Sequence, residues 1–235
     1  MQSHLFVKTT SVTHSRTLNP KPHRCLYIEA SPRKDESASI AAAKTFLSEL
    51  LRLHNTMAID TLNLWDTDLP EFNGETIAAK YAKLAGRAMT PEEAAAWEQI
   101  GKIVERLKTC DALVVATPMW NFGIPYKLKH WIDLITQPGL TFSFDRVEGY
   151  LPLLQPRPTL VILSSAGDYA EGPSRGRPDL ASPYLREAFK FIGLRDVQIA
   201  LVGPTVGLTE QVTSARAAAD QTLTALAATF MGSPL

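Results

Sequence analysis

The sequence of 235 residues lacks most of the features that mark specialised protein classes. Its formal net charge at pH 7 is zero, so the basic surface of a nucleic-acid-binding protein is missing. No apolar run approaches the roughly 20 residues that a membrane-spanning helix needs. Only two cysteines occur, Cys25 and Cys110, which argues against a secreted disulfide scaffold and for a reducing compartment such as the cytoplasm. We expect both thiols to be inert packing groups beside strands.

Motifs that carry chemistry on side chains are also missing. Neither G-x-G-x-x-G nor G-x-x-x-x-G-K-[ST] occurs, so the sequence supports no dinucleotide fingerprint and no ATP-type phosphate loop. The five histidines show no metal-ligand spacing. We also expect no G-x-S-x-G nucleophile elbow. We therefore expect no metal site and no catalytic side chain, and a bound cofactor becomes the favoured carrier of any chemistry.

The N-terminal segment differs in composition from the rest of the chain. Residues 1–28 contain no Asp or Glu but carry Lys8, Arg16, Lys21 and Arg24 among many Ser and Thr. Such a composition can mimic a transit peptide, but the segment has no convincing apolar stripe. We interpret residues 1–23 as a loosely ordered N-terminal extension that precedes one domain at 24–235.

Strand-like and helix-like segments alternate after this extension. Short apolar runs predict strands at 24–30, 58–65, 111–118, 159–164 and 196–202. Helical spacing predicts helices at 37–54, 124–136, 182–192 and 209–230, and two helices across 76–108 that break near Thr90 and Pro91. We therefore predict an α/β fold, a three-layer doubly wound domain around a five-stranded parallel sheet.

In such a sheet the ligand crevice lies beyond the carboxyl ends of the strands, at the point where the strand order reverses. The loops 31–39, 117–123 and 164–172 follow the first, third and fourth predicted strands. These three loops are the candidate site.

The first loop, "SPRKDESAS" (31–39), enters a helix through Ser37, Ala38 and Ser39. The unpaired backbone N–H groups of a helix N-terminus suit a phosphate, and the hydroxyl of Ser31 could add a further donor. The alternative is that Ser37 only caps the helix.

The second and third loops offer a border for a flat ring. Pro118, Met119, Trp120, Asn121 and Phe122 follow the third strand, and Asn121 can both donate and accept hydrogen bonds. Taken alone, such a cluster could equally be core. The small residues Ser164, Ser165, Ala166 and Gly167 would let backbone N–H groups approach a ligand, although ordinary turns use the same residues.

These stretches together resemble a known family. "SPRKDESAS", "PMWNFGIPYKLKHWID", "GLTFSF", "SSAGDY" and "SPYLREAFKFIGL" occur in the order found in the FMN-dependent NADH-azoreductase family of flavodoxin-like NAD(P)H:quinone oxidoreductases. The resemblance runs from about Arg24 to Phe230. The second stretch is the most specific, since the family pattern is close to P-M-Y/W-N-F-x-I-P-x-x-L-K-x-W-I-D.

The resemblance implies a flavodoxin-like fold and an activity. It implies that FMN is bound, that NADH or NADPH is the transient electron donor, and that a quinone or azo compound is reduced by two electrons in a ping-pong mechanism. It also implies a homodimer with a shared site. Carried over residue by residue, it assigns the FMN phosphate to Ser31, Ser37, Ala38 and Ser39, the flavin border to Met119, Trp120, Asn121 and Phe122, and the flavin edge to Ser164, Ser165, Ala166 and Gly167.

The chain departs from the family at the third loop, which commonly reads S-R-G-G. Ser165 and Ala166 replace the Arg and the first Gly. We predict a negative φ at Ala166, because a positive φ would strain the backbone of alanine. We predict that Gly167 is the residue of this loop that needs the conformational freedom of glycine.

Two other readings remain open. A flavodoxin-type electron carrier would bind FMN without turnover, but such carriers are typically shorter and strongly acidic. An FMN or chromate reductase of the same superfamily would usually carry G-S-x-R-x-x-S in its phosphate loop. The sequence assigns no residue that distinguishes NADH from NADPH.

Overall fold

Alternating side chains on the buried strands give the sheet two apolar faces. The computed structural model describes residues 23–232, and all but one residue of the predicted extension lie outside this range. The first strand, β1 (Arg24–Glu29), sends Leu26 and Ile28 to one face and Cys25 and Tyr27 to the other. Each face therefore needs its own layer of helices.

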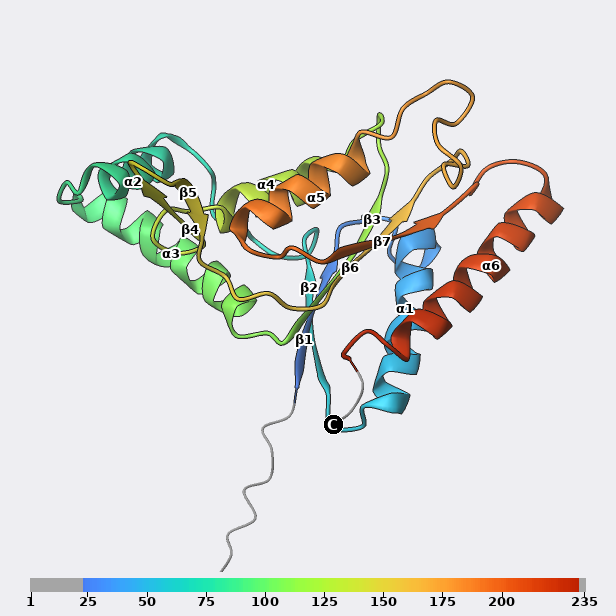
Figure 1. The fold of residues 1–235 in the computed structure, drawn as a ribbon. Helices are drawn as coiled ribbons and strands as arrows, with labels where there is room; N and C mark the ends of the chain where they lie inside the picture. The colour runs from blue at the N-terminus through green and yellow to red at the C-terminus, as the bar shows by residue number, and fades with distance from the viewer. Residues whose placement is uncertain (1–22, 233–235) are drawn as a thin grey trace, which may run out of the picture.

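The main sheet contains five parallel strands, as predicted, and their order is β2-β1-β3-β6-β7. Figure 1 shows this sheet between two helical layers, with α1 and α6 on one face and α3, α4 and α5 on the other. The remaining strands of this sheet are β2 (Ala58–Asn63), β3 (Ala112–Pro118), β6 (Thr159–Ser164) and β7 (Val197–Val202). The helices are α1 (Ala38–Leu53), α2 (Gly74–Ala85), α3 (Pro91–Lys108), α4 (Tyr126–Ile135), α5 (Ala181–Ile192) and α6 (Thr209–Ala227).

The predicted break between two helices in 76–108 is confirmed, and its cause is local. Gly86 ends α2 with φ 65°, a left-handed conformation that glycine adopts without cost. Thr90 then caps α3: its side chain accepts from the N–H of Glu93, while the Glu93 carboxylate accepts from the N–H of Thr90. Pro91 occupies the first helical turn, where its missing N–H costs nothing.

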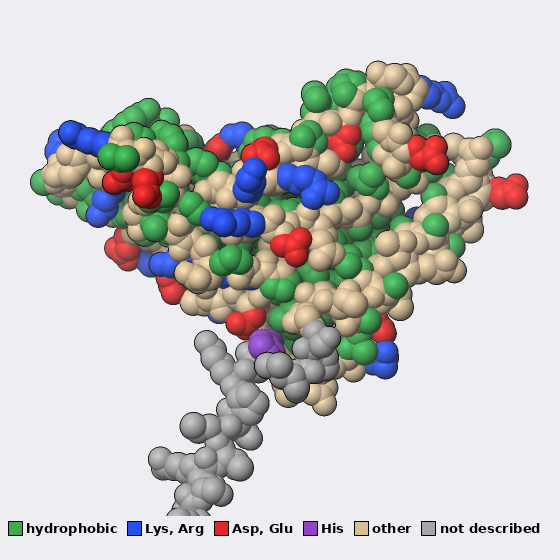
Figure 2. Space-filling view, viewed as in Figure 1, with side chains coloured by type: hydrophobic (Ala, Val, Ile, Leu, Met, Phe, Trp, Pro, Cys, Tyr) green, Lys and Arg blue, Asp and Glu red, His purple; other side chains and the backbone are tan. Residues whose placement is uncertain are grey.

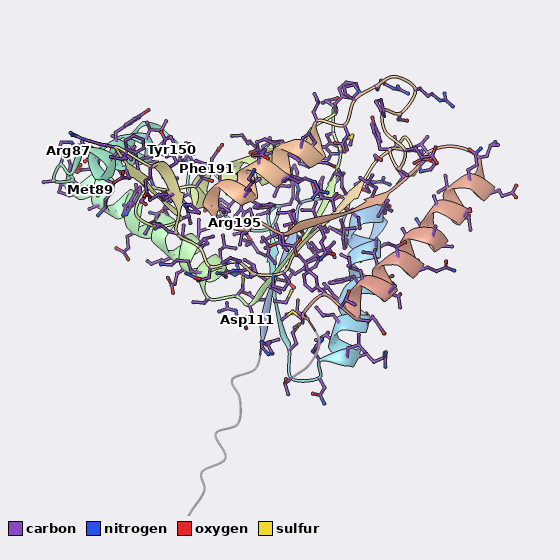
Figure 3. The ribbon with its side chains drawn as sticks, in the orientation of Figure 1. Arg87, Met89, Asp111, Tyr150, Phe191 and Arg195 are labelled. Atoms are coloured by element: carbon purple, nitrogen blue, oxygen red, sulfur yellow. The ribbon has the colours of Figure 1, made fainter. Side chains whose placement is uncertain are left out.

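A small antiparallel hairpin, β4 (Phe142–Asp145) and β5 (Gly149–Pro152), was not predicted from the sequence. It lies apart from the main sheet and packs against α5 through aromatic rings. The ring centroids of Phe142 and Phe191 lie 5.0 Å apart, and those of Tyr150 and Phe191 lie 5.5 Å apart. Figure 3 shows Tyr150 and Phe191 where the hairpin meets α5.

The amino ends of β1 and β2 are held by one carboxylate. Asp60 accepts from Nε of Arg106 at 2.8 Å and from Nη2 of Arg24 at 2.6 Å. The Arg106 and Arg24 guanidinium groups hold the pKa of the Asp60 carboxyl below its usual value, against the opposing effect of burial. This network lies at the opposite end of the sheet from the candidate site.

Both cysteines are unpaired and buried. Burial raises the pKa of the Cys25 thiol to about 12, so the thiolate form is suppressed. The structure places both thiols as packing groups, as expected. Among the described residues, no helix is both long and apolar enough to span a bilayer.

Candidate functional site

The strand order reverses at β1, because β2 lies on one side of it and β3 on the other. The loops that leave the carboxyl ends of β1 and β3 therefore flank the position where doubly wound sheets form their ligand crevice. A hydrogen bond from Ala30 N–H to the carbonyl of Ala116, at 2.9 Å, extends the pairing of these strands into the first loop. The first and second predicted loops thus meet at the switch point.

The first loop brings its three serines together as buried groups. The exposed fractions of Ser31, Ser37 and Ser39 are 1%, 3% and 0%. Ser37 caps α1, and its hydroxyl oxygen accepts a long bond of 3.5 Å from the N–H of Ile40. Its Oγ also lies 3.1 Å from Oγ of Ser39. Both the capping role and the clustering predicted from the sequence are present.

These hydroxyls are not saturated by the protein. Ser37 and Ser39 share one hydrogen bond, in which one hydroxyl donates to the other. The hydroxyl that accepts this bond still has its own hydrogen available for a ligand. The Ser31 hydroxyl accepts from the N–H of Arg33 at 3.4 Å, and no described residue accepts its hydrogen. The N–H groups of Ala38 and Ser39 lie in the first helical turn, where no helical acceptor exists. Buried donors of this kind fit an anionic group with several acceptor oxygens.

The second loop is a two-residue hairpin turn. Trp120 and Gly123 exchange both backbone hydrogen bonds, each at 2.9 Å. The two residues between them have positive φ, 48° for Asn121 and 70° for Phe122. This is the pattern of a type I′ turn, in which Asn is favoured at the first position and Gly at the second. A bulky Phe at that second position is strained, and such strain is characteristic of functional sites.

An aromatic group borders the same turn. Trp65, in the loop after β2, contacts Trp120 at a centroid distance of 6.0 Å and Tyr126 at 5.3 Å. Its indole N–H donates to the carbonyl of Ala30 at 3.1 Å, which ties the β2 loop to the first loop. Sequence reasoning did not assign Trp65 to the site. The available signal was its position as the last residue of the predicted second strand, at the carboxyl end, in "LNLWDTD".

The third loop is fixed to its neighbours by backbone bonds. Ser164 accepts from Met119 N–H at 2.7 Å, and Ser165 N–H donates to Val202 at 3.0 Å. The hydroxyl of Ser165 donates to the carbonyl of Gly167 at 2.8 Å. Ser165, which stands where the family motif has Arg, thus closes the loop on itself.

Ala166 is not among the residues with positive φ, so that prediction is confirmed. The prediction that Gly167 needs the conformational freedom of glycine is wrong. Gly167 does not have a positive φ either; instead, a Cβ there would lie 2.3 Å from Oγ of Ser174. The same crowding occurs at Gly203, where a Cβ would lie 2.6 Å from the carbonyl oxygen of Gly167. Both glycines are needed for close approach of chain segments.

A cleft of about 1610 Å³ opens beside the second and third loops. It includes Met119, Asn121, Phe122 and Ser165–Gly167 but not the serines of the first loop, nor Pro118, Trp120 or Ser164. It extends away from the switch point towards the first half of α6. Figure 2 shows the hollow at the upper right, between the loop around 168–180 and the start of α6. The predicted site therefore comprises one buried cradle in the first loop and one open cleft beside the second and third loops.

The described residues contain no group of three or more His, Cys, Asp and Glu that could hold a metal ion. The expectation that the motif G-x-S-x-G is absent is wrong, because Gly172–Gly176 match it. This stretch forms an irregular turn that begins eight residues after β6, and it lacks the sharp strand-to-helix geometry of a nucleophile elbow.

Comparisons with known proteins agree with this geometry. A protein-family model described as flavodoxin-like fold matches residues 23–226. The chain is 44% identical over 207 residues to the FMN-dependent NADH:quinone oxidoreductase 1 of Bradyrhizobium diazoefficiens, covering 88% of this chain and 99% of that protein. It is 40% identical to the FMN-dependent NADH:quinone oxidoreductase of Desulfotalea psychrophila, over 86% and 94% of the two chains.

Among solved structures, an FMN-dependent NADH-azoreductase of Bacillus anthracis in complex with FMN aligns with a TM-score of 0.73 and 30% identity, over 87% of this chain and 99% of that one. An azoreductase of the same species aligns with a TM-score of 0.78 at 22% identity, which speaks for the fold alone. The chain therefore belongs to the flavodoxin-like family of FMN-dependent NADH:quinone oxidoreductases.

Proposed function

We propose that this protein is an FMN-dependent NADH:quinone oxidoreductase that also reduces azo compounds. Relatives named for the quinone reaction match at 40% and 44% identity over nearly their whole length. A relative solved with FMN is named for the azo reaction. No metal cluster or nucleophile elbow in the described residues offers a competing chemistry.

The observation that carries the proposal is the cradle at the β1/β3 switch point. The hydroxyls of Ser31, Ser37 and Ser39 and the N–H groups of Ala38 and Ser39 would hold the FMN phosphate. They are buried, they have spare hydrogens, and they lie at the positive end of the α1 dipole. A single such cradle suits a mononucleotide.

The flavin ring would lie across the second and third loops. Pro118, Met119, Trp120, Asn121 and Phe122 would border one side, and the backbone of Ser164–Gly167 would meet the ring edge. The backbone bond from Met119 to Ser164 sets these two borders at a fixed spacing. Because the strained turn is closed by two backbone bonds, Asn121 and Phe122 are held in place before any ligand binds.

When bound, FMN supplies the two-electron redox chemistry that the side chains of the site lack. The chain's part is to orient the ring, to expose one of its faces to the cleft, and to present backbone N–H groups at its edge, where they favour negative charge. Donor and acceptor would then use the same cleft in turn.

We further infer a homodimer in the cytoplasm. Phe144, Val147 and Tyr150 on the β4–β5 hairpin are 56%, 93% and 61% exposed, and a second copy would cover this apolar surface. Two buried, unpaired cysteines are consistent with a reducing compartment.

The test is direct. The purified protein should be yellow, should release FMN and not FAD on denaturation, and should oxidise NADH many times faster when a quinone is added. Flavin without quinone-dependent turnover would instead support an electron carrier. Turnover with free flavin or chromate, but not with quinones or azo dyes, would support the related reductases. Failure to hold any flavin after reconstitution would refute the proposal, and light scattering would test the dimer separately.

A further inference from the structure

The segment 168–180 has no role in the site described so far, although it lies beside it. Its upstream anchor is Ser165, whose N–H bonds Val202 at 3.0 Å. Its downstream anchor is Leu180, whose N–H donates to the carbonyl of Phe122 at 3.0 Å. Both ends of the segment are therefore tied to residues that border the cleft.

Two arginines of this segment are presented by a tight turn. Arg177 N–H donates to the carbonyl of Ser174 at 3.0 Å, and the two residues between them have positive φ, 50° for Arg175 and 78° for Gly176. A second type I′ turn thus forms at the cleft. Its first central position normally takes Asn, Asp or Gly, because other side chains are disfavoured with positive φ. Arg175 occupies that position here.

The guanidinium groups have no carboxylate partner in the described residues. No salt bridge within 4.0 Å involves Arg175 or Arg177. The segment also carries three carboxylates, and of these Asp168 and Glu171 line the cleft without forming an ion pair with either arginine. Asp168 accepts from Ala170 N–H at 3.0 Å, and Asp179 accepts from the N–H groups that open α5.

Both arginines line the cleft that also includes Asn121 and Phe122. At about 1610 Å³ the cleft is larger than the roughly 300–1,000 Å³ of a usual small-molecule site, so it has room for a ligand beside the flavin ring. In the proposed reaction the pyridine nucleotide is that ligand, and its phosphates are strong acceptors. Guanidinium groups recognise phosphate through paired, charge-assisted hydrogen bonds.

We propose that Arg175 and Arg177 bind the phosphate groups of the pyridine-nucleotide donor, an inference that rests on the function proposed above. The segment 168–180 then acts as the nucleotide-binding arm of the cleft. Its anchoring at Phe122 sets the distance between the phosphates and the ring border. The ligand group is either the diphosphate, which NADH and NADPH share, or the additional 2′-phosphate of NADPH.

The experiment uses the FMN-loaded protein and the variants Arg175→Ala, Arg177→Ala, their combination, and Arg175→Lys. Arg195→Ala is the matched control, because Arg195 is exposed in the α5–β7 loop at the opposite end of the sheet and has no carboxylate partner among the described residues. KM and kcat are measured with NADH and with NADPH at a fixed quinone concentration. Calorimetry measures the affinity of ADP-ribose, which carries the diphosphate without the nicotinamide.

The double variant should raise KM by at least about tenfold, because the loss of even one charge-assisted hydrogen bond has that effect, and kcat should stay within about twofold. Arg175→Lys should recover part of this loss, since it keeps the charge but not the paired donors. Equal losses for both nucleotides, with weaker ADP-ribose binding, would identify the diphosphate. A loss confined to NADPH would identify the 2′-phosphate.

Unchanged KM values for both nucleotides in a double variant that holds FMN normally would overturn the inference and leave the proposed function intact. A wild-type protein that binds no FMN would refute the proposed function. In that case calorimetry still tests the arginine site. ADP-ribose binding that disappears in the double variant would support the site, and the absence of ADP-ribose binding to the wild-type protein would overturn it.

Discussion

At Phe122 we expect a glycine variant to be more stable than an alanine variant, which is the reverse of the usual order. With φ 70°, residue 122 is in a region where an L side chain costs about 1–2 kcal/mol and glycine costs nothing comparable. We expect Phe122→Gly to be more stable than Phe122→Ala by about 1 kcal/mol. Both variants lose the buried part of the phenyl ring, which is 41% exposed, so this loss cancels in the comparison.

The magnitude follows from two opposing terms. Relief of the positive φ favours glycine by about 1–2 kcal/mol, while the greater freedom of glycine in the unfolded chain disfavours it by about 0.4–1 kcal/mol. In a chain of this size, 1 kcal/mol shifts the midpoint of thermal unfolding by about 2–4 °C. Urea unfolding of the apoprotein, followed by circular dichroism, measures the same difference without any contribution from cofactor binding.

Ala166 supplies the matched control, because it lies in the neighbouring loop with a negative φ. There, Ala166→Gly should lower the free energy of unfolding by about 0.4–1 kcal/mol, the ordinary direction. If Phe122→Ala were as stable as Phe122→Gly, the strain assigned to the turn would be refuted. Both Phe122 variants should also bind FMN more weakly than wild type, measured by flavin fluorescence.

Three further outcomes are expected. Replacing Ser37 and Ser39 together with Asp should weaken FMN binding by at least about tenfold, since two negative charges would face the phosphate; unchanged affinity in a folded variant would contradict the cradle. Gly203→Ala should destabilise by about 1–3 kcal/mol through backbone crowding, whereas Gly101→Ala, with nothing within 4 Å of the new Cβ, should stabilise α3 by up to about 1 kcal/mol. The folded-state pKa of Asp60 is depressed, so its stabilisation is present above the unfolded pKa of about 3.9 and is lost as pH falls through the folded value; Asp60→Asn should therefore lose less unfolding free energy than wild type between about pH 5 and pH 2.

The parts of the fold that the sequence predicted are those set by local chemistry. The buried run at 111–118 and the Thr90–Pro91 start of a helix each specify one structure without reference to distant residues. The β4–β5 hairpin could not be predicted in the same way. Each of its strands has four residues, and its aromatic rings find their partners on α5, some 40 residues later in the chain. Only the folded structure brings those groups together.

The candidate site was predicted as a set of loops, but its geometry was not. The sequence indicated that Ser31, Ser37 and Ser39 belong together, because all three follow one strand and open one helix. It did not indicate Trp65, whose place beside Trp120 depends on β2 lying next to β1. It also gave the wrong reason for Gly167, since the crowding by Ser174 comes from a turn that was not predicted.

The non-glycine residues that adopt a positive φ lie in one region of the fold. Among the described residues, the non-glycine residues with positive φ are Lys34, Asn121, Phe122 and Arg175. Lys34 follows β1, the next two follow β3, and Arg175 follows β6, so all four lie in loops beyond the carboxyl ends of neighbouring parallel strands. At Lys34, Phe122 and Arg175 this conformation costs stability that glycine would spare, whereas asparagine tolerates it. Because such backbone strain clusters at functional sites, its concentration in the loops beyond the carboxyl ends of these strands supports their choice as the candidate site.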